Sequence, residues 1–495
     1  MREKKSEKMH NSKLIKILQA FSPAEIKDFR KFIDSSYFNK EGTYIVRLFD
    51  ELKRFYPEFT GDGLSKERLF KNLYKEKTYN DVLMRKAVSA LIKLAEEFLR
   101  YKAFKESGLE SELLFIRKLR EKRLDKLFES VSGSLEVKLE NPENSVDSDY
   151  FRNRYKLELE KINYFLDFSQ LLGRQQDSMQ SVQKYIVYDS MINLLDIGFN
   201  ILVGITTMYK GKENLVLQLL DRIDLDSVGK VLYESDQGLY PVYELFHKRF
   251  LGFKNFEDDS SYFEYKEIAL KNMTYLTWEN QFTIFISLQN ICTRKFVEGK
   301  RYFVKELHEV HKEMLKQGLY AQQKGNMMNL HTFRNIVLTA SNLNKNEWIT
   351  DFMHEYADKL LPEQKESLTA WARALMLYNK KDFAGALKEL QSVKNDHYLT
   401  KHEIKTMTMK MLYELNEFEP AISFAESYRK MVSNDKTYAE LHRNSYTNFS
   451  VLYLKLVKLK ADNKTDESHF LKREIESTVV NSKDWLLEKV NEMIK

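Results

Sequence analysis

The fold is decided by the segment YNKKDFAGAL at residues 378–387, because a similar segment, YELNEFEPAI, follows at residues 413–422. In each segment an aromatic residue comes directly after a polar break, Phe383 in the first and Phe418 in the second. Trp348 precedes Phe383 by the same interval of 35 residues and also follows a polar break. Self-similarity at a period of roughly 20–50 residues is typical of stacked structural repeats. The spacing therefore predicts successive helical hairpins in which these three aromatic residues occupy equivalent positions.

Positions around the aromatic residues repeat as well. Ala386 and Ala421 stand three residues after an aromatic residue, where two crossing helices would leave room only for a small side chain. Asp351 occupies that position in the first copy and breaks the pattern. Larger residues stand five positions before and four positions after each aromatic residue: Leu343, Tyr378 and Tyr413 before, and Phe352, Leu387 and Ile422 after.

Over roughly residues 320–432 this pattern resembles the tetratricopeptide (TPR) repeat, a helix–turn–helix unit of about 34 residues. The usual early glycine is missing, and the closing proline is present only as Pro362, one position away from its place. The resemblance implies an all-α fold built as a right-handed α-solenoid of TPR-like helix pairs. The alternative is an irregular helical bundle in which the spacing is accidental. The matching positions are Ala374, Leu377, Phe383, Ala386 and Leu390, then Met409, Leu412, Phe418, Ala421 and Ala425.

The composition agrees with a helical, globular protein. Among 495 residues, 43% are hydrophobic, while only 6 are Pro and 16 are Gly. Such a scarcity of helix breakers favours long helices and few strands. The single cysteine, Cys292, excludes an internal disulfide, and its apolar neighbours predict that it is buried.

Residues 1–108 are predicted to form a separate, small and basic helical N-terminal domain. They hold 24 Lys and Arg against 16 Asp and Glu, whereas the rest of the chain is nearly neutral. Ser22, Pro23 and Glu25 form a helix-start signature, and Asn80 is placed to cap a long helix. The rest of the chain divides into a connecting helix (109–132), a linker rich in Gly, Ser and Asn (133–149), irregular helical pairs (150–318), TPR-like repeats (319–435) and C-terminal capping helices (436–495).

No sequence motif points to catalysis. A phosphate-binding loop, a dinucleotide-binding fingerprint and a nucleophile elbow are all missing from the sequence. The best metal candidate is the pair His308 and His311, but its spacing differs from that of the zincins, and Lys305 and Lys312 would repel a cation. We therefore expect no catalytic residue, no cofactor and no metal site.

Stacked helical repeats commonly provide binding surfaces, so we expect a non-catalytic scaffold for a protein or peptide partner. TPR modules that clamp a carboxyl terminus use Lys and Asn on their first helices, and the matching positions here are mostly apolar, among them Phe333, Ile336 and Trp371. We expect no such clamp. The apolar first-helix faces indicate either an apolar peptide groove or contact with another helix. The polar candidates for a groove wall are Arg334, Arg373 and Lys410.

The alternative is a DNA-binding regulator with a winged-helix-like N-terminal domain and a TPR-like sensor region. Residues 64–70 followed by 79–94 have the order of a short helix and a recognition helix. In that arrangement Arg85, Lys86 and Lys93 would face phosphates. The helix is predicted to continue past Leu94, where a two-stranded wing should begin.

A cytoplasmic location without membrane insertion is expected. The charged N-terminus is not followed by a long apolar run. The most apolar stretch, Met191–Tyr209, contains Asp196, which would be costly in lipid and favours a core helix. Three phrases, FSPAE at 21–25, SYFN at 36–39 and DWLLEK at 484–489, resemble those of bacterial proteins of this helical kind, and the resemblance implies no activity.

Overall fold

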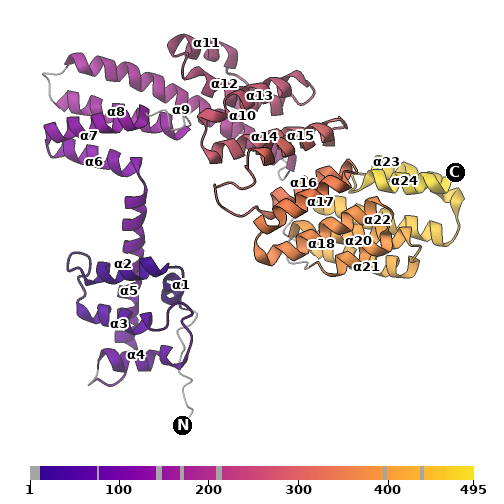
Figure 1. The fold of residues 1–495 in the computed structure, drawn as a ribbon, viewed down its shortest axis with the longest axis horizontal. Coiled ribbons are helices and arrows are strands. Elements are labelled where there is room, and N and C mark those ends of the chain that lie inside the picture. The colour runs from indigo at the N-terminus through magenta and orange to yellow at the C-terminus, as the bar shows by residue number, and fades with distance from the viewer. Residues whose placement is uncertain are drawn as a thin grey trace. The chain divides into compact units, whose positions relative to one another are not determined.

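The computed structural model describes residues 12–74, 77–140, 148–167, 172–207, 214–393, 398–434 and 440–494. Within these ranges the protein consists of helices α1–α24 and short 3-10 turns, with no strand (Figure 1). The predicted all-α class is confirmed for them. The chain divides into two compact units: unit 1 holds Met1–Leu139 and Lys156–Met179, and unit 2 holds Glu140–Tyr155 and Gln180–Lys495.

Unit 1 begins with four helices that pack around a fifth. Its core is aromatic: the Phe29 ring lies 5.1 Å from the Phe49 ring and 5.3 Å from the Phe98 ring, between centroids. Burying such rings removes a large apolar area from water, which stabilises this bundle. The helices are α1 (Lys13–Gln19), α2 (Pro23–Asp34), α3 (Thr43–Lys53), α4 (Lys66–Leu73) and α5 (Asp81–Glu106).

The predicted helix starts in this bundle are confirmed. The Ser22 hydroxyl accepts from the Glu25 amide, and the Glu25 carboxylate accepts from the Ser22 amide at 2.8 Å, so the capping box is complete. Lys102 of α5 also donates to Glu25 at 2.8 Å, which lowers the pKa of this carboxyl group to about 2. Asn80 caps α5 by accepting from the Leu83 amide.

The next segment differs from the prediction. Two helices, α6 (Leu109–Glu121) and α7 (Asp125–Glu140), replace one connecting helix followed by a linker. The chain turns at Arg123, whose φ is 54°, and the Leu124 amide donates back to the Leu119 carbonyl. Residues 133–140 are helical because Leu135 and Leu139 are buried in the core. Residues 141–147 of the predicted linker lie outside the described residues.

Two long helices follow, α8 (Ser148–Asp167) and α9 (Leu172–Thr207). Over Gln175–Ile205, α9 is long and apolar enough to cross a membrane by length and composition alone, and a third of its most apolar window is buried. Ile192, Leu195 and Phe199 of this helix are buried against other helices of unit 2. These contacts agree with the prediction of a core helix.

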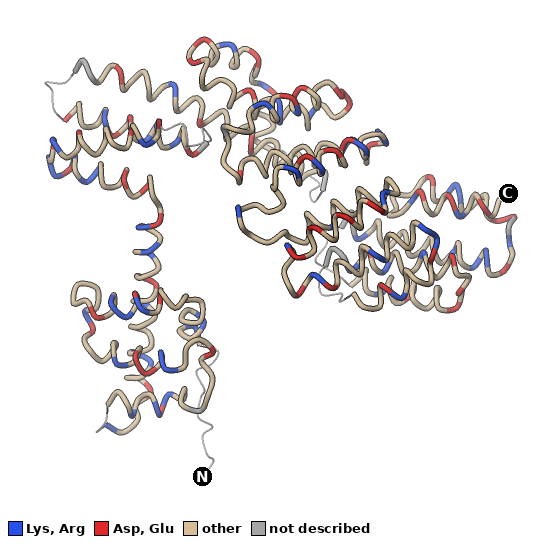
Figure 2. The backbone as a smooth tube through the Cα atoms, viewed as in Figure 1, with Lys and Arg blue, Asp and Glu red and all other residues tan. Residues whose placement is uncertain are grey.

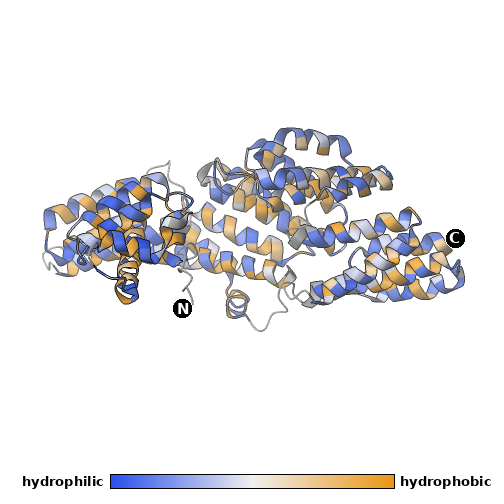
Figure 3. Ribbon diagram, turned by 90° about the horizontal axis from the view of Figure 1, so that it is seen from below, coloured by the Kyte–Doolittle hydropathy of each residue, from blue (hydrophilic) through white to orange (hydrophobic). Residues whose placement is uncertain are grey.

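In unit 2, consecutive helices pack as antiparallel pairs, and each pair contacts the next from α12 onward. Figure 3 shows hydrophobic and hydrophilic residues alternating along these helices, as expected where one face of each is buried. The helices are α10 (Leu215–Leu220), α11 (Leu225–Ser235), α12 (Tyr240–Lys254), α13 (Ser260–Lys271), α14 (Trp278–Val297), α15 (Phe303–Lys316), α16 (Leu330–Asn342), α17 (Asn346–Tyr356), α18 (Pro362–Asn379), α19 (Phe383–Gln391), α20 (Tyr398–Glu414), α21 (Phe418–Asn434), α22 (Glu440–Ala461), α23 (Ser468–Ser477) and α24 (Lys483–Ile494).

Gly252 lies inside α12 and does not end the helix. A Cβ atom at this position would come within 3.2 Å of the Ser261 carbonyl oxygen on α13. The glycine is therefore explained by the close approach of two backbones. Gly299, with φ 105°, instead follows the end of α14.

The same turn geometry joins the two helices within each of several successive pairs. Asn344, Lys381 and Asn416 have φ values of 54°, 62° and 59°, in the left-handed region. The amide that follows each of them donates to the carbonyl five residues earlier, for example Asp382 to Leu377 at 3.0 Å. This is the Schellman motif, which satisfies carbonyl groups at a helix end. Gly299 makes the same turn between α14 and α15, so the motif extends to a pair that the 35-residue period did not detect.

These turns correct the predicted register. Phe383 and Phe418 are each the first residue of their helix, but Trp348 is the third residue of α17, and Asn346 holds the equivalent place. The interval is 35 residues from Lys381 to Asn416, but 37 from Asn344 to Lys381. The predicted equivalence of Trp348 is therefore wrong by two positions.

The corrected register explains why Asp351 broke the pattern. The residue that matches Ala386 and Ala421 is Ile349, because each of the three donates its amide to the cap of its own helix. All three side chains are fully buried. Isoleucine is larger than alanine, so this position of α17 does not require the small side chain found in α19 and α21.

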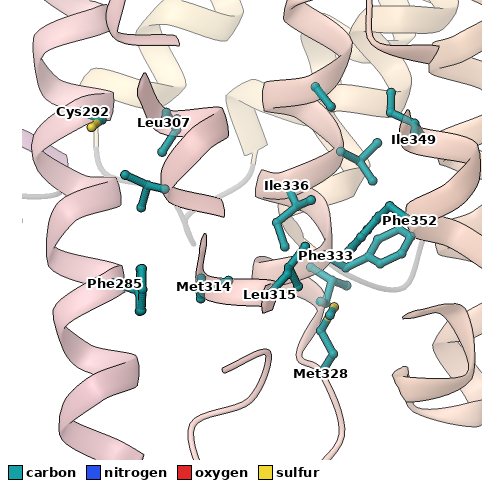
Figure 4. Packing of buried hydrophobic residues seen from close by; sticks show 14 of the residues in the cluster. Phe285, Cys292, Leu307, Met314, Leu315, Met328, Phe333, Ile336, Ile349 and Phe352 are labelled. Atoms are coloured by element: carbon teal, nitrogen blue, oxygen red, sulfur yellow. The ribbon is translucent and has the colours of Figure 1, made fainter. Parts of the chain in front are cut away.

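The apolar first-helix faces are buried against neighbouring helices. Phe333 and Ile336 of α16 lie in the main core together with Phe352 of α17 (Figure 4). Leu368 and Trp371 of α18 are buried in the same core. Of the two possibilities that the sequence left open, helix contact is the one found at these positions.

Candidate functional site

An open groove of about 1080 Å³ lies between the second helices of two neighbouring pairs, α15 and α17. A second hollow of about 580 Å³ continues along the same helices and shares Glu309, Lys312, Trp348 and Asp351 with the first. We call the two together the α15–α17 trough. Its first part is lined by Lys305, Glu306, His308, Glu309, Lys312, Leu343–Trp348, Thr350, Asp351, Met376 and Lys380.

The floor of the trough is aromatic. The half-buried Trp348 ring stacks on the Phe352 ring with centroids 5.6 Å apart. The His308 ring meets Trp348 edge-on at 4.6 Å, so this pair bridges α15 and α17. Stacked and edge-on rings hold one another in place, and the floor is therefore a fixed apolar surface.

Charged groups of both signs surround this floor. Lys305, Lys345 and Lys380 are exposed and make no ion pair with another described residue, and the same holds for Glu347 and Asp351. Unpaired surface charges keep their capacity to bind a partner, because no internal contact must be broken first. The trough therefore offers an apolar centre with a mixed charged rim.

The two histidines of α15 are buried and neutral. His311 is fully buried, and neither of its ring nitrogens has a hydrogen-bond partner among the residues that the structure describes; burial lowers its pKa to about 3. Burial also lowers the pKa of His308, whose Nδ1 likewise has no partner in the described part of the chain. Among the described residues no group of three or more His, Cys, Asp or Glu side chains could hold a metal ion.

None of the predicted groove-wall residues lines the trough. Arg334 of α16 pairs with Glu403 of α20, and Arg373 of α18 pairs with Glu389 of α19 at 2.9 Å. The Lys410 ammonium lies 5.7 Å from the centre of the Trp485 ring, and burial lowers its pKa to about 8. These three side chains connect helices, so their contacts are internal.

The nucleic-acid candidates lie on α5. Arg85 pairs with Asp81 one turn earlier, while Lys86 and Lys93 are exposed. The helix continues through Leu94 to Glu106, and no strand occurs in the described part of residues 12–107. A helix therefore stands where the two-stranded wing was required. Figure 2 shows acidic residues interspersed with the basic ones on these helices.

One residue of the trough, Trp348, stands out in the sequence, but because of the repeat period and not because of a binding motif. Trp348 was singled out as a repeat marker, and its displacement by two positions places its ring in the trough. The sequence also shows a polar break before Trp348, but not the left-handed turn at Asn344. The trough itself depends on the separation of α15 and α17, which no local pattern encodes.

Comparison of the chain with protein-family models, with curated proteins and with solved structures found no match.

Proposed function

We propose that this protein is a non-catalytic scaffold whose helical repeats bind a protein or peptide partner along the α15–α17 trough. Its helix pairs would form a right-handed α-solenoid of the TPR-like kind. The observation that carries the proposal is the open, aromatic-floored trough between two successive second helices.

The size of the trough favours a peptide segment as the occupant. Sites for drug-sized molecules are commonly clefts or cavities of about 300–1000 Å³, whereas the first part of this trough, of about 1080 Å³, continues into a second hollow of about 580 Å³. α17 has 11 residues, so the trough is roughly 16 Å long at 1.5 Å per residue. A strand of about five extended residues covers that distance.

The chemistry of the lining indicates what the segment should carry. Tryptophan is a frequent hot spot in interfaces because its ring offers a large area at a low entropic cost. An apolar side chain of the partner would rest on Trp348, and flanking charges of either sign would meet Lys380 or Asp351. A cytoplasmic partner fits the expected location.

A site-specific cross-linking experiment tests the proposal. A photoreactive phenylalanine analogue would replace Thr350, which is exposed in the trough, or Lys388, which is exposed on α19 outside it. Irradiation in extract of the native cells should give a protein adduct from position 350 and not from position 388. The adduct should weaken when Trp348 is replaced by Ala. Equal labelling from both positions would overturn the proposal.

The same experiment distinguishes a protein partner from the nucleic-acid alternative. Its remaining support is the exposed pair Lys86 and Lys93 on α5. If nuclease treatment abolishes the adduct, and Lys86→Glu with Lys93→Glu does the same, DNA binding replaces the scaffold proposal. An adduct that survives nuclease supports a protein partner.

A further inference from the structure

A smaller pocket of about 230 Å³ lies elsewhere in unit 2, between α9, α12 and α14. Its polar lining comes from side chains of three helices that the trough does not use. The full set is Asn193 and Asp196 of α9, Leu245, Phe246 and Arg249 of α12, Leu276, and Asn280, Thr283 and Ile284 of α14.

Arg249 is the least expected residue in this pocket, because it is charged and only 4% exposed. Its Nη1 donates to Asp196 at 2.5 Å, and its Nε donates to the Ser287 hydroxyl at 2.8 Å. The guanidinium also lies 4.0 Å from the centre of the Phe199 ring. These contacts fix the group and leave Nη2 without a partner among the described residues. Nη2 carries two N–H donors, and a carboxylate is a suitable acceptor for them.

The pocket lining also offers oxygen acceptors. The Asn193 amide nitrogen donates to Asp189 at 2.7 and 2.8 Å, which leaves the Asn193 amide oxygen available. The Thr283 hydroxyl donates to the Glu279 carbonyl and keeps its lone pairs. The Asp196 carboxylate binds Arg249 and Asn200 and has further acceptor capacity. Three acceptors with one negative charge suit an ammonium group, which has three donors and no acceptor.

The remaining wall is apolar. It consists of Leu245, Phe246, Leu276 and Ile284. At about 30 Å³ per water molecule, 230 Å³ corresponds to a ligand of only several heavy atoms. A small apolar side chain fits beside the charged groups.

We propose that this pocket binds a small zwitterion, an α-amino acid with a short apolar side chain. Its carboxylate accepts from Nη2 of Arg249, and its ammonium group lies among Asp196, Asn193 and Thr283. A simple anion is disfavoured, because Asp196 already neutralises Arg249. A ligand that carries both charges instead places its carboxylate beside Arg249 and its ammonium group beside Asp196, so that each charge lies next to one of opposite sign. The site is independent of the partner trough and adds a small-molecule ligand to the protein.

Ligand titration of the full wild-type chain tests this assignment. Alanine, valine and leucine would be compared with their N-acetyl and methyl ester forms, by thermal shift and by isothermal titration calorimetry. We expect the free amino acids to raise Tm in a concentration-dependent way. Each blocked form removes one charge and should bind at least ten-fold more weakly. The assignment is wrong if no free amino acid shifts Tm at millimolar concentration, or if the blocked forms bind equally well.

Two threonine variants provide a matched comparison. Thr283→Val removes a hydroxyl in the pocket, whereas Thr369→Val removes one on α18 that makes the same kind of bond to a carbonyl four residues earlier. The first should weaken binding several-fold and the second should leave it unchanged. Arg249→Lys should abolish binding. If this variant fails to fold, the two threonine variants and the blocked ligands still test whether the pocket binds an amino acid. Equal binding by both threonine variants would also overturn the assignment.

Discussion

At the scale of single residues, His311 is the side chain with the most unusual environment. It is fully buried on α15, and within the described ranges neither ring nitrogen has a hydrogen-bond partner. Burial favours the neutral imidazole, so the folded pKa of about 3 lies well below the unfolded value near 6.5. The unfolded chain therefore binds one more proton between these values. The resulting stability is complete above about pH 6.5 and is lost as the pH falls toward 3.

We predict that His311→Leu removes this pH dependence. At pH 5 the wild-type imidazole should cost about 2 kcal/mol of unfolding free energy relative to pH 7.5. Urea unfolding at pH 7.5, 6 and 5 measures the slope. His354→Leu, on the exposed side of α17, is the control and should keep the wild-type slope. If His311→Leu has the same slope as the wild type, the buried imidazole is not its source.

Lys381 provides a second residue-scale prediction. Its φ is 62°, in the left-handed region that disfavours residues with a Cβ atom by about 1–2 kcal/mol. Lys381→Gly should raise the unfolding free energy by about 0.5–1 kcal/mol. The substitution removes the steric cost of the left-handed conformation, but glycine loses more backbone entropy on folding, which offsets part of the gain. Lys380, next to it, has φ −80°, so Lys380→Gly should lower stability instead. Denaturant titrations in which Lys381→Gly raises the unfolding free energy and Lys380→Gly lowers it would support the argument. Changes of the same sign in both variants would contradict it.

At the scale of elements, the sequence predicts what local chemistry determines. The capping box at Ser22 and the cap at Asn80 depend on residues within three positions, and both helices begin where predicted. The linker prediction over 133–140 failed because Ser134 and Lys138 lie on the exposed face of a helix whose other face buries Leu135 and Leu139. Composition alone does not distinguish a loop from an exposed helical face.

The candidate site was less predictable than the helices. Trp348 matched a 35-residue period, but the turns show an interval of 37 residues between the first two pairs. Two extra residues move its ring from the start of α17 to the floor of the trough. Arg334, Arg373 and Lys410 were chosen because they are polar, yet each one contacts a neighbouring helix. Such pairings depend on distant segments, which a single sequence does not reveal.

The DWLLEK phrase at 484–489 has a structural role in α24. Trp485 packs its ring 5.3 Å from Tyr413 and 6.1 Å from Tyr453, and its indole nitrogen donates to Glu414. The Lys489 ammonium also pairs with Glu414, at 2.9 Å. The last helix is thereby fastened to α20 and α22.

We predict that Trp485→Ala lowers the unfolding free energy of this region by about 3–5 kcal/mol, the usual cost of removing a large buried ring. Limited proteolysis should then cut α23 and α24 first, because their packing would be lost. Phe470→Ala on α23 is the control, since this ring is 72% exposed and its removal should change little. Equal protease resistance of the two variants would show that Trp485 does not fasten the helix.

At the scale of the whole molecule, two compact units share one chain, and α8 and α9 each contribute residues to both. The Phe29 side chain is fully buried in the core of the N-terminal bundle, and Trp371 is buried in the main core of unit 2. Separate cores unfold separately when few contacts join them, so a single two-state transition is not expected. The shared helices give a physical route for partial coupling between the two.

Calorimetry of two core variants tests this division. Phe29→Ala and Trp371→Ala each remove a large ring and should cost about 3–5 kcal/mol. Since 1 kcal/mol corresponds to about 2–4 °C for units of this size, each variant should lower one thermal transition by about 10 °C. Phe29→Ala should act on the transition of unit 1 and Trp371→Ala on that of unit 2. If both variants shift one common transition equally, the shared helices couple the cores so strongly that the chain unfolds as a single cooperative body.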